Sequence, residues 1–254
     1  MKNFLFPFFF STSLLFAQSD LEKANSAYSL RSAGSIKNKA DNIQIDLAIK
    51  HYESAIKRNN SLEATEGILK SYYFSGKYVS SNIDEKKKIF NKAVKLGEKF
   101  ILEYPESPGI RYWYLVNLGS WAEAYGVIAA ARSGFADTMR VHSKKIIDMD
   151  SMYNNGGGYF MLGVVHLRAP YIPFFLPWPD KVKAEKLLES ATKTGENTLP
   201  QKFNYAKALY KNNQKIKALK FLNEVIKSNP SGENKVEEWD QILEAKKFLM
   251  SIEE

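Results

Sequence analysis

The chain has 254 residues, of which 44% are hydrophobic, 25% charged and 13% aromatic, a composition typical of a folded globular protein. It contains no cysteine, which excludes disulfide frameworks, cysteine-ligated zinc, iron–sulfur clusters, thiol nucleophiles and a lipid anchor on cysteine. The net charge of +8 comes from lysines spread along the sequence rather than from one basic block. Such a distribution predicts solvated helix surfaces and no nucleic-acid partner.

The first seventeen residues have the pattern of a secretory signal peptide. Lys2 is followed by a mostly apolar run that ends on the small residue Ala17. A membrane-spanning helix needs roughly 18 consecutive apolar residues, whereas this run is shorter and is interrupted by Pro7 and by the Ser-Thr-Ser group at 11–13. We therefore predict that residues 1–17 are removed. Residues 18–254 are then expected to form one exported, periplasmic and soluble domain, without a transmembrane span and not a lipoprotein.

One spacing recurs along the rest of the chain: a small residue, a second residue four positions later and an apolar residue three positions after that. The copies are Ala48/Tyr52/Ala55, Ala93/Gly97/Phe100, a weaker Met139/Ser143/Ile146, Ala184/Leu188/Ala191 and Ala218/Leu222/Val225. These offsets place each set on one face of a helix. Further amphipathic segments precede most copies, at 64–74, 111–131, 159–168 and 203–211. Each repeat is thus predicted to be a helix pair, and stacked pairs predict an all-α solenoid.

The last apolar pattern predicts a C-terminal helix over residues 233–252. Trp239, Ile242, Leu243 and Phe248 recur there at helical spacing. A repeat array needs a terminal element that covers its last apolar face. We therefore expect these four side chains to cap the last helix pair.

The repeats resemble those of the tetratricopeptide repeat family. The segment from Tyr159 to His166 carries that family's Trp/Tyr-x-x-Leu-Gly-x-x-Tyr signature, with His166 in the last place. The step of 34 residues from Ala184 to Ala218 matches the family's period. The resemblance implies a right-handed superhelix of about five helix pairs plus the capping helix. It also implies a concave groove that binds a peptide or helix of a partner protein.

An aromatic series in the middle of the chain is the first candidate site. Trp113, Asn117, Trp121 and Tyr125 follow one another at steps of four, so we expect one slowly drifting helical ridge with an amide between two indoles. Such a ridge is typical of core packing. The alternative is the wall of a ligand cavity, because small-molecule pockets combine aromatic walls with a few polar groups.

A proline-rich insert at residues 168–180 is the second candidate site. Its four prolines prevent a helix, and it is too apolar for an ordinary solvated loop. The aromatic residues are Tyr171, Phe174, Phe175 and Trp178. The segment either folds back to plug the solenoid, or forms a partner surface or the lip of a cavity.

The two candidate sites together resemble the T-component of TRAP transporters. The matching order is Trp113 and Asn117, the turn at 148–150, Leu162-Gly163, a proline-containing insert, Lys183-Ala184 and Glu189-x-Ala191. The resemblance implies a periplasmic protein whose helices enclose an apolar pore, which binds a small apolar or organic-acid ligand and associates with a substrate-binding protein. Self-association into a homo-oligomer is compatible with it. Residues 124–147 also resemble, distantly, the helical region of regulator of microtubule dynamics proteins.

No constellation of catalytic residues is evident. His51, His142 and His166 lack zincin-type spacing, and Gly156 to Gly158 precede Tyr159 rather than the Lys-Ser/Thr of a phosphate-binding loop. We therefore predict a scaffold that is not an enzyme and that has no metal, cofactor or catalytic residue. Two binding functions remain open. A closed apolar tunnel would favour the small ligand, and an open polar groove would favour the peptide.

Overall fold

A computed structural model of the protein describes residues 19–253. The predicted signal peptide at 1–17 lies outside these residues. Within the described range the chain is all-α, as predicted, and the only β-type pairing is two isolated bridges in loops. None of the helices between residues 19 and 253 combines the length and hydropathy that a membrane crossing requires.

The helices form five consecutive pairs, as the repeats predict. The pairs are α1 (Asp20–Ser29) with α2 (Ile43–Arg58), α3 (Leu62–Phe74) with α4 (Ile83–Glu103), α5 (Pro108–Tyr125) with α7 (Phe135–Met149), α8 (Tyr153–Arg168) with α9 (Lys181–Thr192), and α10 (Leu199–Lys211) with α11 (Lys215–Ile226). A π-helix η1 (Ser75–Val79) prolongs α3, a short α6 (Val127–Arg132) follows α5, and η2 (Gly232–Asn234) leads into α12 (Lys235–Glu253). The predicted repeat architecture is confirmed.

The recurring residues occupy the second helix of each pair, and all of them are buried. In α9 the three positions, Ala184, Leu188 and Ala191, are fully inaccessible to solvent, and the corresponding positions in α11 are as well. The helical offsets of four and three explain this, since they bring the three side chains onto the face that packs against the first helix of the pair.

Small residues in the pattern allow neighbouring helices to approach closely. A Cβ atom at Gly97 in α4 would lie 2.6 Å from the Tyr114 ring of α5. At Gly163, the glycine of the Leu-Gly signature, a Cβ would lie 2.6 Å from Leu188 Cγ. The two glycines therefore set the distance between helices, which no larger residue would permit without repacking.

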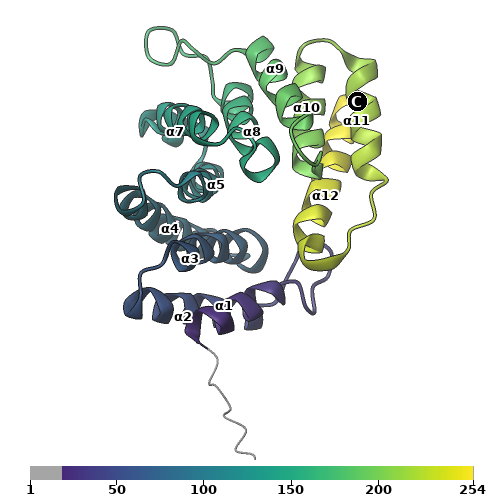
Figure 1. Ribbon diagram of the computed structural model, residues 1–254. Coiled ribbons are helices and arrows are strands. Elements are labelled where there is room, and N and C mark those ends of the chain that lie inside the picture. The colour runs from purple at the N-terminus through teal and green to yellow at the C-terminus, as the bar shows by residue number, and fades with distance from the viewer. Residues whose placement is uncertain (1–18, 254) are drawn as a thin grey trace, which may run out of the picture.

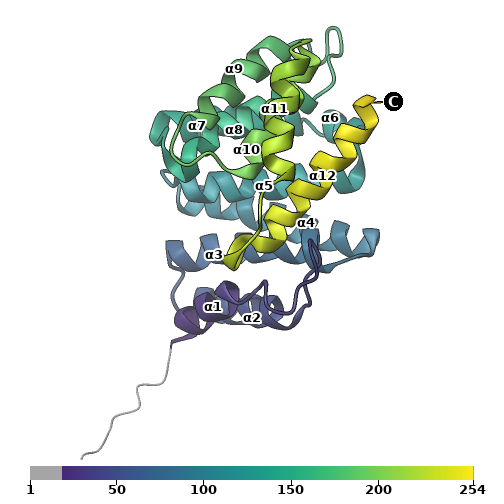
Figure 2. The ribbon, with the colours of Figure 1, turned by 90° about the vertical axis from the view of Figure 1, so that its right-hand side faces the viewer.

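The pairs curve into a ring-like superhelix (Figure 1). The first helices α1, α3, α5, α8 and α10 line its inner side, and the second helices form the outer layer. Helix α12 does more than cap the last pair, because it runs from α10 and α11 across to the first pair (Figure 2). Of the four residues predicted to cap that pair, Trp239, Ile242 and Phe248 join the cluster formed with α10 and α11.

One local prediction needs correction. Residues 111–131 are not one helix: α5 ends at Tyr125, and Gly126 turns the chain with a positive φ of 96°. The first residues of α8 form a turn that leads into the predicted segment 159–168, because Asn154, Asn155 and Gly156 are left-handed. That turn is held by Asn155, whose Oδ1 accepts from Glu196 N (3.0 Å) and whose carbonyl accepts from Gln201 Nε2 (2.5 Å).

Candidate functional site: the central cavity

A cavity of about 460 Å³ lies inside the ring and is the candidate binding site. Its wall is formed by all five first helices, α1, α3, α5, α8 and α10, together with η1, η2 and α12 and with Met139 of α7. Six aromatic side chains line it: Tyr28, Tyr73, Tyr78, Tyr112, Trp113 and Phe160. Charged side chains of both signs lie between them, so the wall is neither a plain apolar tunnel nor an open polar groove.

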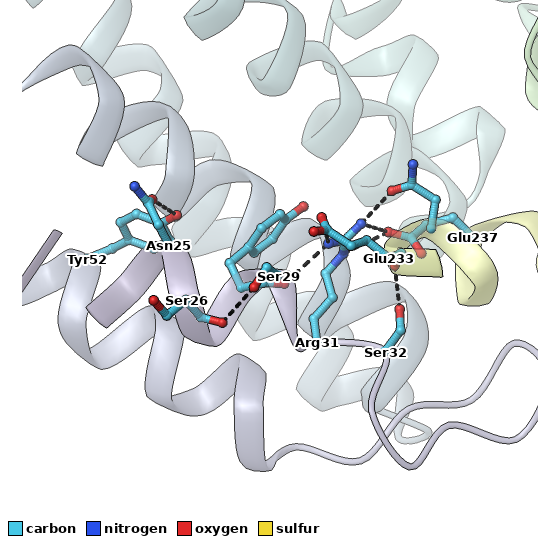
Figure 3. A network of polar contacts seen from close by, with 10 residues as sticks. Asn25, Ser26, Ser29, Arg31, Ser32, Tyr52, Glu233 and Glu237 are labelled. Carbon is cyan, nitrogen blue, oxygen red and sulfur yellow. Dashed lines mark hydrogen bonds and ion pairs between the residues drawn. The ribbon is translucent and has the colours of Figure 1, made fainter. Parts of the chain in front are cut away.

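Arg31 closes the ring between its two ends (Figure 3). The side chain is 4% exposed and stacks 4.4 Å above the Tyr28 ring. Its Nε donates to Glu237 Oε1 at 3.0 Å, and its NH2 donates to Asn234 Oδ1 at 2.6 Å. Glu233 lies 3.7 Å away and adds a weaker ion pair. The guanidinium thus joins the first helix pair to the start of α12, 206 positions away.

Further contacts strengthen the same junction. Ser32 donates from Oγ to the Glu233 carbonyl at 2.6 Å, and Asn38 donates from Nδ2 to Asp240 Oδ1 at 3.0 Å. Val236 is fully buried within the apolar cluster formed by residues of α1 to α5. Polar bonds around a buried apolar contact make a specific interface, so the ring is closed by a packed junction and not by an isolated surface ion pair.

A second charged group bridges the opposite wall. Lys77 Nζ lies 2.8 Å from Glu123 Oε2, and Arg168 NH1 lies 2.6 Å from Glu123 Oε1. Burial alone would raise the pKa of Glu123, but the two cations outweigh it and lower the pKa to about 2. The carboxylate therefore remains ionised at neutral pH and ties η1, α5 and α8 together.

Aromatic rings form a continuous arc beside this bridge. The Trp113 ring lies 6.0 Å from Tyr73 and 5.5 Å from Tyr112, and Lys70 Nζ lies 5.5 Å from it. The Tyr73 and Tyr78 hydroxyls are 2.9 Å apart, so one donates to the other. The arc offers flat apolar faces and phenol groups to whatever occupies the cavity.

A smaller apolar pit of about 120 Å³ adjoins the main cavity beyond the Glu123 bridge. Most of its lining is alanine, valine, phenylalanine, methionine and proline from α5 to α8 and the insert. The two spaces share Gly119, Glu123, Met139, Val164 and Arg168. The ion-paired Glu123 and Arg168 therefore separate the charged, aromatic cavity from the apolar pit.

The predicted ridge does not form one wall of this cavity. Trp113 faces the cavity, but Asn117 is fully buried, with Nδ2 donating to the carbonyls of Leu69 (3.0 Å) and Trp113 (2.8 Å). Asn117 thus clamps α5 onto α3. A step of four residues advances about 40° beyond a full helical turn, so successive ridge members face different neighbours.

Trp121 and Tyr125 pack toward the outer layer. Their rings stack 4.0 Å apart, and Trp121 Nε1 donates to Asn91 Oδ1 at 2.6 Å. Asn91 Nδ2 in turn donates to the Tyr125 hydroxyl at 2.7 Å. These contacts bind α5 to α4, and the cavity is lined instead by residues such as Val116, Gly119 and Glu123.

The proline-rich insert does not plug the ring. Tyr171, Phe174 and Phe175 are exposed, whereas Trp178 at its base is half-buried against His166, with ring centres 5.0 Å apart. Pro170 lines the apolar pit. The insert therefore contributes its first residues to the pit and projects its aromatic tip into solvent.

His142 and His166 both have lowered pKa values, so they are neutral at pH 7. Burial and the nearby charges of Arg111 and Lys145 lower the pKa of His142 to about 4. Burial, followed by Lys183, lowers the pKa of His166 to about 4 as well. Among residues 19–253 no three His, Asp or Glu side chains come together as a metal site would require.

Comparison with solved structures identifies the architecture. A thermophilic TPR protein of Thermus thermophilus superposes with a TM-score of 0.60 at 15% sequence identity, over 89% of this chain and 99% of the other. The fold is tetratricopeptide-like. No protein-family model matches the chain, and no curated protein sequence matches it.

The chain therefore has the helical-repeat fold that its sequence predicted. Arg31 and Glu237, which close this scaffold into a ring, were not among the sequence-based candidates. No local pattern connects them, because each is an ordinary charged residue on its own helix. Lys77, Glu123 and Arg168 were missed for the same reason.

Proposed function

We propose that this scaffold is a binding protein for a small organic ligand, which it holds in the central cavity. The observation that carries the proposal is the closure of the ring by α12, which adds a further wall to the cavity on the concave side of the repeat array. Its volume of about 460 Å³ falls within the range of small-molecule sites.

The lining of the cavity indicates the chemistry of the ligand. The aromatic arc around Trp113 and the charged bridge at Glu123 suit a ligand with a flat or apolar body and polar substituents.

The predicted cellular setting completes the proposal. The resemblance of Trp113, Asn117 and Leu162-Gly163 to the TRAP T-component supports an exported protein that exchanges its ligand with a substrate-binding protein. Export is tested by the mass and N-terminal sequence of the protein recovered from its native cells. A chain that begins at Gln18 supports it, and an intact Met1 in an unfractionated extract contradicts it.

Gly119 offers a direct test of ligand binding. It lines both the cavity and the pit, and the nearest atom to an added Cβ is Met139 Cε at 3.9 Å. A larger side chain therefore projects into empty space rather than into the core. Gly119→Leu is expected to fold and to fill the cavity, and Gly119→Ala is the matched control, because it gains the same helix propensity with little bulk.

The measurement is native mass spectrometry of gently purified protein. We expect extra mass of small-molecule size on the wild type and on Gly119→Ala, and none on Gly119→Leu. If Gly119→Leu retains the same ligand, the ligand lies outside the cavity. If the wild type carries no ligand but co-purifies with a polypeptide that Gly119→Leu also retains, the protein-interaction function replaces the proposal.

A further inference from the structure

The tip of the insert between α8 and α9 carries the most exposed group of apolar side chains on one loop of the described chain. In Figure 1 the loop that connects α8 to α9 projects away from the ring at the upper left, above α7. The exposed fractions are 64% for Tyr171, 36% for Ile172, 103% for Phe174 and 58% for Phe175. None of the four joins an apolar cluster of the core.

The backbone holds Phe174 in a conformation that disfavours an aromatic residue. Its φ is +65°, in the left-handed region that glycine and asparagine enter easily and bulky side chains rarely enter. Folding alone would therefore prefer another residue at this position. A strained, fully exposed aromatic side chain therefore indicates a role in binding rather than in folding stability.

Part of the backbone of the tip is hydrogen-bonded within the loop. Ile172 N donates to the Leu176 carbonyl at 3.0 Å, Leu176 N donates back to the Ile172 carbonyl at 2.7 Å, and Phe175 N donates to the same carbonyl at 3.2 Å. Pro173 and Pro177 have no N–H group. Because unpaired N–H groups are costly in an apolar medium, this pattern lowers the cost of moving the tip out of water.

The base of the tip is rigidly anchored. Leu176 is 2% exposed and packs in the core cluster of α5, α7 and α8. The Trp178 ring lies under the Arg140 guanidinium at 4.5 Å, and its Nε1 donates to Asp137 Oδ1 at 2.9 Å. The aromatic tip therefore has a fixed direction, so little order has to be gained when it binds.

Basic groups surround this base. The charges that act on His166, which contacts Trp178, include Lys183, Arg140 and Lys144, and Lys181 begins α9 directly after the insert. Two acidic groups, Asp137 and Asp180, lie among these basic groups, and Asp137 neutralises Arg140. Asp137 pairs with Arg140 at 3.2 Å, and Asp180 caps α9 by accepting from Val182 N and Lys183 N.

We propose that the tip at residues 171–175 inserts into the interface of an anionic lipid bilayer. Aromatic side chains partition into the headgroup region, and basic residues behind them face the phosphates. A protein partner is less well matched, because one convex hairpin tip offers much less than the roughly 800 Å² per partner of a stable protein interface. The proposal does not depend on the cavity ligand.

The absence of cysteine allows the insertion to be measured at a single position. Tyr171→Cys carries a polarity-sensitive fluorophore beside intact Phe174 and Phe175. Leu102→Cys, at a side chain 83% exposed on α4, is the control. The chain is mixed with vesicles of equal parts phosphatidylcholine and phosphatidylglycerol, or of phosphatidylcholine alone. A blue shift is expected at 171 only, with the acidic vesicles, and it should weaken with salt.

Phe174→Asn in the Tyr171→Cys chain tests the strained aromatic residue itself. Asparagine suits the left-handed backbone, so thermal stability should hold or rise while vesicle affinity falls about tenfold. No blue shift at 171, or an unchanged affinity in Phe174→Asn, overturns the proposal. The tip binds a protein partner instead if two results occur together. The fluorophore at position 171 shows no blue shift with vesicles, and a cellular polypeptide cross-links to the Tyr171→Cys chain but not to the same chain with Phe174→Asn.

Discussion

Single side chains in this protein connect segments that its sequence keeps far apart. Glu123 is the clearest case, since one carboxylate holds Lys77 at 2.8 Å and Arg168 at 2.6 Å. Asn117 does the same for α3 and α5 through two backbone carbonyls. Both residues lie on the helix that the sequence marked as functional, but their roles follow from partners that its pattern does not contain.

The Glu123 bridge predicts an acid-dependent loss of stability. Its pKa falls from an ordinary 4.5 to about 2 on folding, so the stabilisation is fully present above pH 4.5 and is lost as the pH falls toward 2. The side chain is 43% exposed, and solvent screening reduces the effect. We expect Glu123→Gln to narrow the difference in melting temperature between pH 6 and pH 3.

The control for this pH series is Glu98→Gln, at an exposed position on α4. The melting temperature of Glu98→Gln should change with pH as that of the wild type does. A Glu123→Gln curve that parallels the wild type across the same range would show that the bridge does not contribute to stability.

At the scale of helices, the recurring small residues mark the positions where neighbouring helices pack closely. Ala, Gly and Ser recur where a neighbouring helix must come near, and the ring or branched chain of the partner fills the space. The sequence periodicity determined this face correctly for all five second helices, because the contacts lie within and between adjacent helices. It failed at Gly126, where a positive φ ends α5 within an unbroken apolar pattern.

Gly97→Ala tests the close approach of α4 and α5. The new Cβ would lie 2.6 Å from Tyr114 Cδ2, on a ring that is 3% exposed and cannot move freely. Overpacking should lower the free energy of unfolding by about 1–3 kcal/mol, even though alanine is the better helix former. Urea denaturation measures the difference. Gly119→Ala is the matched control, and equal stability of the two variants would contradict the packing role.

At the scale of the whole molecule, the first and last elements meet. The Arg31 network and buried Val236 join residues near position 30 to residues near 237, which makes a ring from a linear repeat array. Binding of the proposed ligand and closure of the ring should therefore be coupled, since α12 contributes to the cavity wall.

Arg31→Met is expected to open this junction. It leaves the largely buried Glu237 without its cation, which typically costs about 3 kcal/mol. Amide hydrogen exchange over residues 235–245 should quicken, and the radius of gyration from small-angle scattering should rise. The double variant Arg31→Met/Glu237→Met removes both charges and should restore most of the protection. Unchanged exchange in Arg31→Met would mean that apolar packing alone closes the ring.

The sequence by itself determined the helices, their pairing and the all-α repeat architecture, because helical periodicity and small residues at helix contacts are local signals. It also singled out Trp113 and the aromatic insert, but the exposure of the insert's tip came from the structure. Only the tertiary structure decided what lines the cavity, since a drift of about 40° per step of four separates Trp113 from Trp121. Ring closure was decided there as well, because Arg31 and Glu237 meet only through the accumulated curvature of five helix pairs.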